Sequence, residues 1–351
     1  MGAEMTYGAL SAKVRALYGK RLRAADFAHM AGLRNEAEIL EYLRQHPGWS
    51  RAMALVPPGS WGYVGRVEVE SALQEELRLE YQNLCYYVPR TDKPLMQFLV
   101  RSAERTAILN ALRRLKSGKY ARPAPPAHAI LLHGRLDEAA TAACTSYDQL
   151  LQAARDTIYA PVLRQLRPAR EGEVPDYTLT ESLLRTAYYA YFYRIVRQQY
   201  RGHTQKVLLR ALGEQIDLLN IIHVLRLKTY FPQTEPDTYL RILFPFHYRL
   251  NPAFTRSLCA APGADGVFAL LRDSPYRDCF TDVHVDEVEE YYLRAIYRFN
   301  KRQLASVPPS VYTAMAYLEL KNLETSVLVN VIESVKYGVP YNKEFADLVG
   351  E

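Results

Sequence analysis

Residues 208–229 read LLRALGEQIDLLNIIHVLRLKT, a run in which apolar residues recur at intervals of three and four. This spacing places Leu218, Ile222 and Leu225 on one face of an α-helix, as in a helix packed into a core. Two similar stretches flank it, FLVRSAERTAILNALRRLKSGK at 98–119 and LELKNLETSVLVNVIESVKYGV at 318–339. The sequence therefore predicts one helix in three copies.

The three copies share polar residues in one register. Each has a Glu, an Asn six positions later and a Lys or Arg six positions after that, and successive asparagines are 110 residues apart. The nine positions are Glu104, Asn110, Lys116, Glu214, Asn220, Arg226, Glu324, Asn330 and Lys336. A fixed period of this kind indicates a repeated structural unit.

Each unit contains at least one further helix, because a leucine lies 37 residues before each asparagine, at Leu73, Leu183 and Leu293. A capping box, Thr178 to Glu181, predicts the start of the second of these helices, and acidic residues at 286–290 predict the start of the third. Helix-breaking residues follow each copy: prolines at 119–126 and at 231–236, and Gly338 with Pro340 after the third. We expect an all-α protein with domains at 1–120, including an extra N-terminal helix, at 121–231 and at 232–351.

Composition narrows the class of protein. The chain has 351 residues, 49% of them hydrophobic, and a net charge of +6, so we expect a soluble globular protein and no nucleic-acid partner. No apolar run approaches the length of a transmembrane helix, and the first residues lack the pattern of a secretory signal. Cys85, Cys144, Cys259 and Cys279 lie far apart and form no metal-binding motif. The cytoplasm is the expected location.

The chain resembles a known family in three stretches: YGALSAKVRALYGKRL at 7–22, the triplicated helix, and IDLLNIIHVLRLK at 216–228. The combination is similar to the C-type subunit of bacterial and archaeal V/A-type ATPases, whose eukaryotic counterpart is the d-type subunit of the vacuolar enzyme. The resemblance implies a funnel-like body of three homologous helical domains around a pseudo-threefold axis. It also implies a rotor component with no catalysis, metal or cofactor of its own. Its partners would be the D-type subunit that forms the central-stalk axle and the membrane proteolipid ring, met at the cytoplasmic face.

The repeated glutamates fall within the apolar stripe of their helices on a helical wheel, whereas the asparagines face away from it. We interpret each Glu as bound to the preceding helix, with Arg78, Tyr188 and Arg298 as candidate partners of Glu104, Glu214 and Glu324. Each Asn is expected to bond to another helix or loop. Direct binding of a partner protein by the glutamates is the alternative, and a convergence of all three would instead favour an acid-base or metal site.

Arg113, His223 and Glu333 occupy one position of the repeat and differ in charge. We predict that they form an exposed flank that distinguishes one lobe from another, as a socket for a single axle requires.

Three other stretches invite functional interpretations that we consider weaker. YYAYFYRIVRQQYRG at 188–202 interleaves tyrosine and arginine, but its apolar spacing favours helix packing over base stacking. PPGSWGYVG at 57–65 lacks the residues of a phosphate-binding loop, and DVHVDEVEE at 282–290 is more typical of a helix start than of a metal site. A helical-repeat scaffold that recruits cytosolic proteins is the alternative to the rotor function, although three copies that fill the chain favour a closed body.

Overall fold

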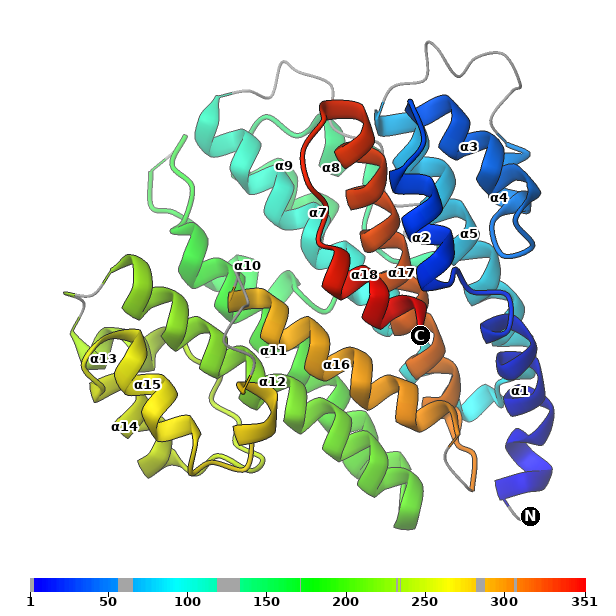
Figure 1. Ribbon diagram of the computed structural model, residues 1–351. Coiled ribbons are helices and arrows are strands. Elements are labelled where there is room, and N and C mark those ends of the chain that lie inside the picture. Colours follow the sequence, from blue (N-terminus) through cyan, green and yellow to red (C-terminus); the bar gives the residue numbers. More distant parts are fainter. Residues whose placement is uncertain are drawn as a thin grey trace. The chain divides into compact units, whose positions relative to one another are not determined.

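The structure is a computed structural model that describes residues 3–55, 66–118, 133–170, 172–231, 233, 235–281, 288–305 and 308–351. All regular elements in these ranges are helices (Figure 1), which confirms the predicted all-α class. The stretch 57–65 and most of the stretch around His284 lie outside the described residues, as does the predicted break at 119–126.

The described chain divides into two compact units, with boundaries inside two helices, α7 and α16. Unit 1 contains the described residues of 3–103 and 297–351, with His133 and Gly134. Unit 2 contains those of 104–118 and 135–296. The predicted division into three homologous domains stays a prediction.

Unit 1 is built around its longest helix, α17 (Val311–Tyr337), which carries the third copy of the repeat. Helices α1 (Ala3–Tyr18), α2 (Ala24–Ala31), α3 (Glu36–Gln45) and α5 (Arg66–Tyr87) pack against it. The unit also contains α4 (Ser50–Met53), η1 (Arg90–Asp92), α6 (Lys93–Met96), the start of α7 (Phe98–Ser117), the end of α16 (Val288–Leu304) and α18 (Lys343–Gly350). A helix is present at the position of the predicted extra N-terminal helix, as α1, and its being additional to the first repeat stays a prediction.

Both ends of α17 follow from the local sequence. The Ser310 side chain caps the first turn by accepting a hydrogen bond from the Tyr312 N–H at 3.2 Å. Gly338 ends the helix at φ 67°, a left-handed conformation that glycine adopts without steric cost, and its N–H donates to the Ser334 carbonyl. The predicted stop at Gly338 is therefore confirmed.

Unit 2 is built around α11 (Tyr177–Gln199) and α12 (Gly202–Tyr230), two long helices joined by a short turn. The other elements are the rest of α7, α8 (Glu138–Ala143), α9 (Tyr147–Ala153), α10 (Ala160–Gln165), α13 (Pro236–Ile242), α14 (Pro252–Ala260), α15 (Gly263–Leu271), η3 (Arg277–Cys279) and the start of α16. Leu218, Ile221 and Leu225 of α12 enter a core shared with α13, α14 and α15.

The start of α11 differs from the prediction. The Asp176 carboxylate, rather than Thr178, is the N-cap and accepts a hydrogen bond from the Leu179 N–H at 2.8 Å. Aspartate caps a helix at least as well as threonine does, so the helix begins slightly earlier than the Thr178–Glu181 box indicated.

Candidate functional site

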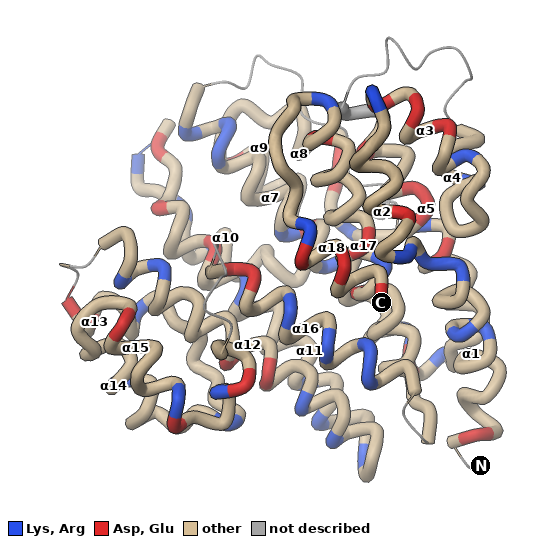
Figure 2. Tube along the Cα trace, viewed as in Figure 1, with Lys and Arg blue, Asp and Glu red and all other residues tan. Residues whose placement is uncertain are grey.

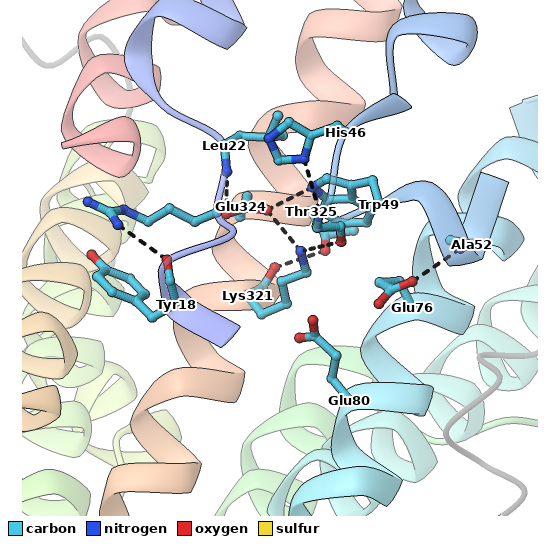
Figure 3. Close-up of polar contacts among 12 residues, drawn as sticks. Tyr18, Leu22, His46, Trp49, Ala52, Glu76, Glu80, Lys321, Glu324 and Thr325 are labelled. Atoms are coloured by element: carbon cyan, nitrogen blue, oxygen red, sulfur yellow. Dashed lines mark hydrogen bonds and ion pairs between the residues drawn. The ribbon is translucent and has the colours of Figure 1, made fainter. Parts of the chain in front are cut away.

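Unit 1 buries four charged side chains where α5 faces α17 (Figure 3). Glu76 and Glu80 project from α5, and Lys321 and Glu324 project from α17. None of the four is more than 4% exposed. We call these four residues the charge cluster. Isolated charges are costly to bury, so the cluster depends on the contacts that each side chain makes.

Glu324 binds three groups that lie far apart in the sequence. Its Oε1 accepts hydrogen bonds from the Trp49 Nε1 at 2.8 Å and from the Lys321 Nζ at 3.0 Å, and its Oε2 accepts one from the Leu22 N–H at 3.3 Å. One carboxylate therefore joins α17 to the segment after α1 and to the segment before α4 (Figure 3).

Lys321 is the cation of the cluster. Its Nζ donates to the Gly48 carbonyl at 3.3 Å and lies 3.6 Å from the centre of the Trp49 ring. Burial by itself lowers the pKa of this ammonium group, but the carboxylates of Glu324 and Glu80 outweigh it, and the pKa is raised. Lys321 therefore stays charged while it is fully enclosed.

Glu76 and Glu80 differ in their partners. Glu76 pairs with Arg51, whose side chain is half exposed, and accepts a hydrogen bond from the Ala52 N–H at 3.1 Å. Glu80 accepts one from the Tyr317 hydroxyl at 2.6 Å. Burial raises the pKa of Glu80, and the nearby Glu76 carboxylate adds to this, so Glu80 holds a proton more tightly than an exposed glutamate does.

Unit 2 has a different buried polar site, on α12. The Asp217 carboxylate, 1% exposed, accepts hydrogen bonds from three successive N–H groups, those of residues 248, 249 and 250, at 3.2, 2.7 and 3.0 Å. The Tyr276 hydroxyl donates to the same carboxylate at 2.8 Å. Gly213, one turn earlier, lets this loop approach, because a Cβ there would lie 2.3 Å from the Tyr248 ring.

Asn220 continues this contact one turn later. Its Nδ2 donates to the Phe244 carbonyl at 3.3 Å, and the Phe244 N–H donates to its Oδ1 at 2.9 Å. The prediction that the repeated Asn bonds to another segment is confirmed here. Asn220 is nevertheless only 3% exposed, because the loop after α13 covers the helix face that points away from the apolar stripe.

Asn110 and Asn330 behave differently from Asn220. Asn110 is half-buried, and its Oδ1 accepts a 3.4 Å hydrogen bond from Arg113 of the same helix, whereas Asn330 is exposed. The shared asparagine therefore has one structural role in α12 and others in the remaining copies.

The repeated glutamates have three different environments. Glu104 is fully buried, and its Oε1 accepts a hydrogen bond from the Arg135 N–H at 2.7 Å. Glu214 pairs with Arg210 of its own helix at 2.8 Å and lies 4.0 Å from Arg249. The prediction of a partner on the preceding helix is wrong for Glu214 and Glu324, which bind their own helix and segments brought to it by the fold.

The predicted partners lie elsewhere. Arg78 pairs with Glu75, Arg298 is exposed, and the Tyr188 ring lies 5.4 Å from the Arg105 guanidinium. In the described contacts, each of the three glutamates binds a different set of groups.

The basic ends of the repeat lie on surfaces. Arg226 pairs with Glu289 at 2.9 Å and Lys336 pairs with Glu36 at 2.8 Å, while Lys116 is exposed. The Arg226–Glu289 pair is about half exposed and contributes little to stability.

Of the predicted flank, only Arg113 is exposed, with its guanidinium 4.6 Å from the Tyr177 ring. Glu333 is half-buried. The His223 ring is largely covered and lies 5.4 Å from the Phe244 ring. Burial lowers the pKa of His223 to about 4. His223 is therefore a neutral packing residue near pH 7 rather than part of an exposed flank.

The sequence patterns did not mark Lys321, Trp49, Glu80 or Asp217 as site residues. Asp217 left a signal, since it interrupts the apolar run IDLLN at 216–220. The 3-residue spacing of Lys321 and Glu324 and the 4-residue spacing of Glu76 and Glu80 are common on exposed helix faces, so spacing alone does not mark them as buried.

The described residues hold no group of three His, Cys, Asp or Glu side chains arranged to bind a metal ion. None of the helices in the described ranges combines the length and apolarity needed to cross a membrane. Glu324, Asp217 and Asn220 instead bind backbone groups of segments distant in the sequence, so they hold these segments together.

The protein is therefore all-helical, and polar contacts between segments that lie far apart in the sequence hold its long repeated helices in place. A family model described as the ATP synthase (C/AC39) subunit matches residues 10–343, and the chain belongs to this family. The resemblance to the C-type subunit of V/A-type ATPases is thereby confirmed.

A curated relative is also similar to this chain. The C subunit of the A-type ATP synthase from Methanosphaera stadtmanae is 24% identical over 230 residues, which are 62% of this chain and 53% of that protein. The chain thus spans about half the length of this curated relative.

Proposed function

We propose that this chain is the central-stalk rotor component of a V/A-type rotary ATPase. It links the axle, formed by a D-type subunit, to the membrane proteolipid ring at the cytoplasmic face, and so couples ATP hydrolysis or synthesis to ion transport. It performs no catalysis itself. Its three repeats form lobes around an axis, and their shared centre receives the axle tip.

The family match over residues 10–343 is the observation that carries this proposal. Unit 1 contains segments from both the first and the last third of the chain, which supports a closed body rather than an open stack of repeats. Repeats in an open stack contact only their neighbours, so the first and third would not meet. In unit 1, Glu76 and Glu80 of the first third lie near Lys321 and Glu324 of the last third, which an open three-repeat scaffold does not require.

The proposal is tested by isolating the complex from detergent-solubilised membranes with an affinity tag on this chain. The axle and proteolipid subunits should co-purify with it. Membranes that lack the chain should hydrolyse ATP without pumping ions, and adding the purified chain back should restore pumping. Full ATP-driven pumping in its absence would contradict the proposal.

Charge reversals at two positions of the predicted flank, the exposed Arg113 and the half-buried Glu333, refine this test. Arg113→Glu and Glu333→Lys should each weaken coupling, to unequal extents, with helical content unchanged. Lys116→Glu is the matched control, because it changes an exposed charge on the same helix as Arg113. If a variant with both charges reversed still coupled ATP hydrolysis to ion transport normally, the proposed socket for the axle would be ruled out.

A further inference from the structure

The turn between α11 and α12 carries charge of a single sign. Residues 182–213 contain six Lys and Arg and no Asp or Glu. The outer two are compensated, since Arg185 pairs with Glu181 at 2.9 Å and Arg210 pairs with Glu214 at 2.8 Å. The other four are Arg194, Arg197, Arg201 and Lys206, and we call them the basic hairpin.

All four side chains of the basic hairpin are exposed or half-buried at the surface. Within the described part of the chain, none of them forms an ion pair. Arg201 donates to the carbonyls of residues 197, 198 and 200, so its guanidinium is held at the end of α11. Figure 2 shows Lys and Arg, and no Asp or Glu, along the joined ends of these two helices.

Only the helix that begins after the turn, α12, adds a positive partial charge to that of the basic hairpin. The first turn of α12 contains no acidic residue, and its N-terminal N–H groups carry partial positive charge. Arg197 lies in the last turn of α11, where the helix dipole favours basic side chains, and Arg201 and Lys206 lie near the positive start of α12. No acidic side chain of the hairpin offsets these exposed charges, so an external anion is the natural counterpart.

The kind of anionic partner follows from what the surface lacks. Protein interfaces are anchored by exposed aromatic or large apolar residues. Large exposed hydrophobic residues occur at Leu179 and at Tyr230, but none occurs at 180–229, a stretch that the structure describes throughout. Anionic lipid headgroups need no such anchor, and clusters of four or more Lys and Arg on helices are typical of surfaces that bind them.

We propose that the basic hairpin docks on the anionic headgroups of a membrane surface. The inference rests on the proposed function, because only a component of a membrane-bound complex would bring the hairpin close to lipid. The contact is electrostatic and peripheral. It holds the chain near the membrane without insertion.

Binding of the purified full-length chain to vesicles tests this inference. The chain should sediment with phosphatidylcholine vesicles that contain about 30% phosphatidylglycerol and not with phosphatidylcholine alone. Binding should weaken steeply between about 0.05 M and about 0.3 M salt, because screening shortens the reach of the charges.

A triple variant, Arg194→Gln, Arg197→Gln and Lys206→Gln, isolates the hairpin. At about fivefold per basic residue, its partition into anionic vesicles should fall about a hundredfold. The matched control, Arg164→Gln, Arg256→Gln and Arg272→Gln, removes the same charge from three sites elsewhere in unit 2 and should bind nearly as the wild type does. Far-UV circular dichroism of both variants checks that the helices are intact.

Three outcomes would overturn the inference: equal loss of binding in both variants, equal binding of the wild type to neutral vesicles, or unchanged vesicle binding by a hairpin variant that no longer assembles with its complex. The last result would assign the hairpin to an acidic protein partner. Vesicle binding uses the isolated chain, so its failure leaves co-purification with the proteolipid ring intact. The proposed function would instead fail if the proteolipid ring did not co-purify with the chain.

Discussion

Glu324 of α17 and Glu214 of α12 occupy the same position of the repeat, but their surroundings differ. Glu324 is buried and binds Lys321, the Trp49 indole and the Leu22 N–H. Glu214 retains some exposure and pairs with Arg210 on the same helix. In unit 1, the segments after α1 and before α4 cover the glutamate. In unit 2, the loop at 243–250 covers other positions of the helix, where Asp217 and Asn220 bind it.

The comparison shows how one sequence motif serves two kinds of site. The carboxylate that ties distant segments together is the repeated Glu in α17 and a non-repeated Asp, three residues later, in α12. Residues at the same position of the repeat can therefore have different roles, because the role depends on which segment packs over the residue.

The largest effect is expected for Glu324→Ala. It leaves the Lys321 ammonium, the Trp49 indole N–H and the Leu22 N–H without their acceptor, so the free energy of unfolding should fall by about 3–5 kcal/mol. Urea denaturation followed by circular dichroism measures this loss. A fall below about 1 kcal/mol would show that the buried contacts of Glu324 are no stronger than a surface pair.

Asp217→Ala is expected to cost about 3 kcal/mol, since it strands three backbone N–H groups and the Tyr276 hydroxyl. Asp217→Asn keeps one acceptor oxygen and should recover part of the loss. Hydrogen exchange of the N–H groups of residues 248–250 should accelerate in the Ala variant. Protection equal to the wild type would contradict the assigned role.

His223 should make unit 2 sensitive to acid. Its folded-state pKa of about 4 lies below the ordinary value of 6.5, so the unfolded chain takes up a proton first as the pH falls. Its contribution to stability is complete above about pH 6.5 and is lost as the pH falls to about 4, by up to about 3 kcal/mol.

His223→Gln, which does not titrate, should flatten this part of the stability curve. Its charged neighbours Arg185, Glu181 and Arg226 are unchanged in the variant. Denaturation midpoints measured from pH 4 to pH 7 provide the test, and parallel curves for the two proteins would rule out His223 as the source.

Glu80→Gln should be mild, in contrast to Glu324→Ala. Because the folded-state pKa of Glu80 is raised, its favourable contribution is complete below the unfolded pKa and is lost as the pH rises through the folded value. Glutamine resembles the protonated acid and still accepts from Tyr317. At pH 4 the change should stay within about 1 kcal/mol, and the variant should gain on the wild type as the pH rises. A variant that loses stability relative to the wild type between pH 4 and pH 8 would oppose this view.

Glu214→Ala should have the smallest effect, less than about 1 kcal/mol, because its Arg partners are about half exposed and remain hydrated without it. Measured beside Glu324→Ala under the same conditions, it completes the comparison. Equal losses in the two variants would mean that position in the repeat, rather than burial, sets the energy.

The helical elements were predictable because helix formation depends on residues three and four apart. The three repeat helices, the helices that carry Leu73, Leu183 and Leu293, and the stop at Gly338 all follow from such local patterns. The start of α11 was misassigned by a short distance, since Asp176 and Thr178 are both competent caps. The partners of the glutamates could not be predicted, because helix spacing indicates which face is apolar and not which segment covers it.

The amino-acid sequence on its own determined the helical class, the triplicated helix and the family, all of which rest on local periodicity or on residue identity. Tertiary packing determined that Glu324 and Asp217 hold distant segments together, whereas Glu214 forms an ion pair near the surface. The partners of Glu324 at Leu22 and Trp49 are 302 and 275 residues away in the chain. Contacts over such distances arise from burial of apolar faces, which brings segments together whatever polar groups they carry, and the cost of burying a charge then selects its partners.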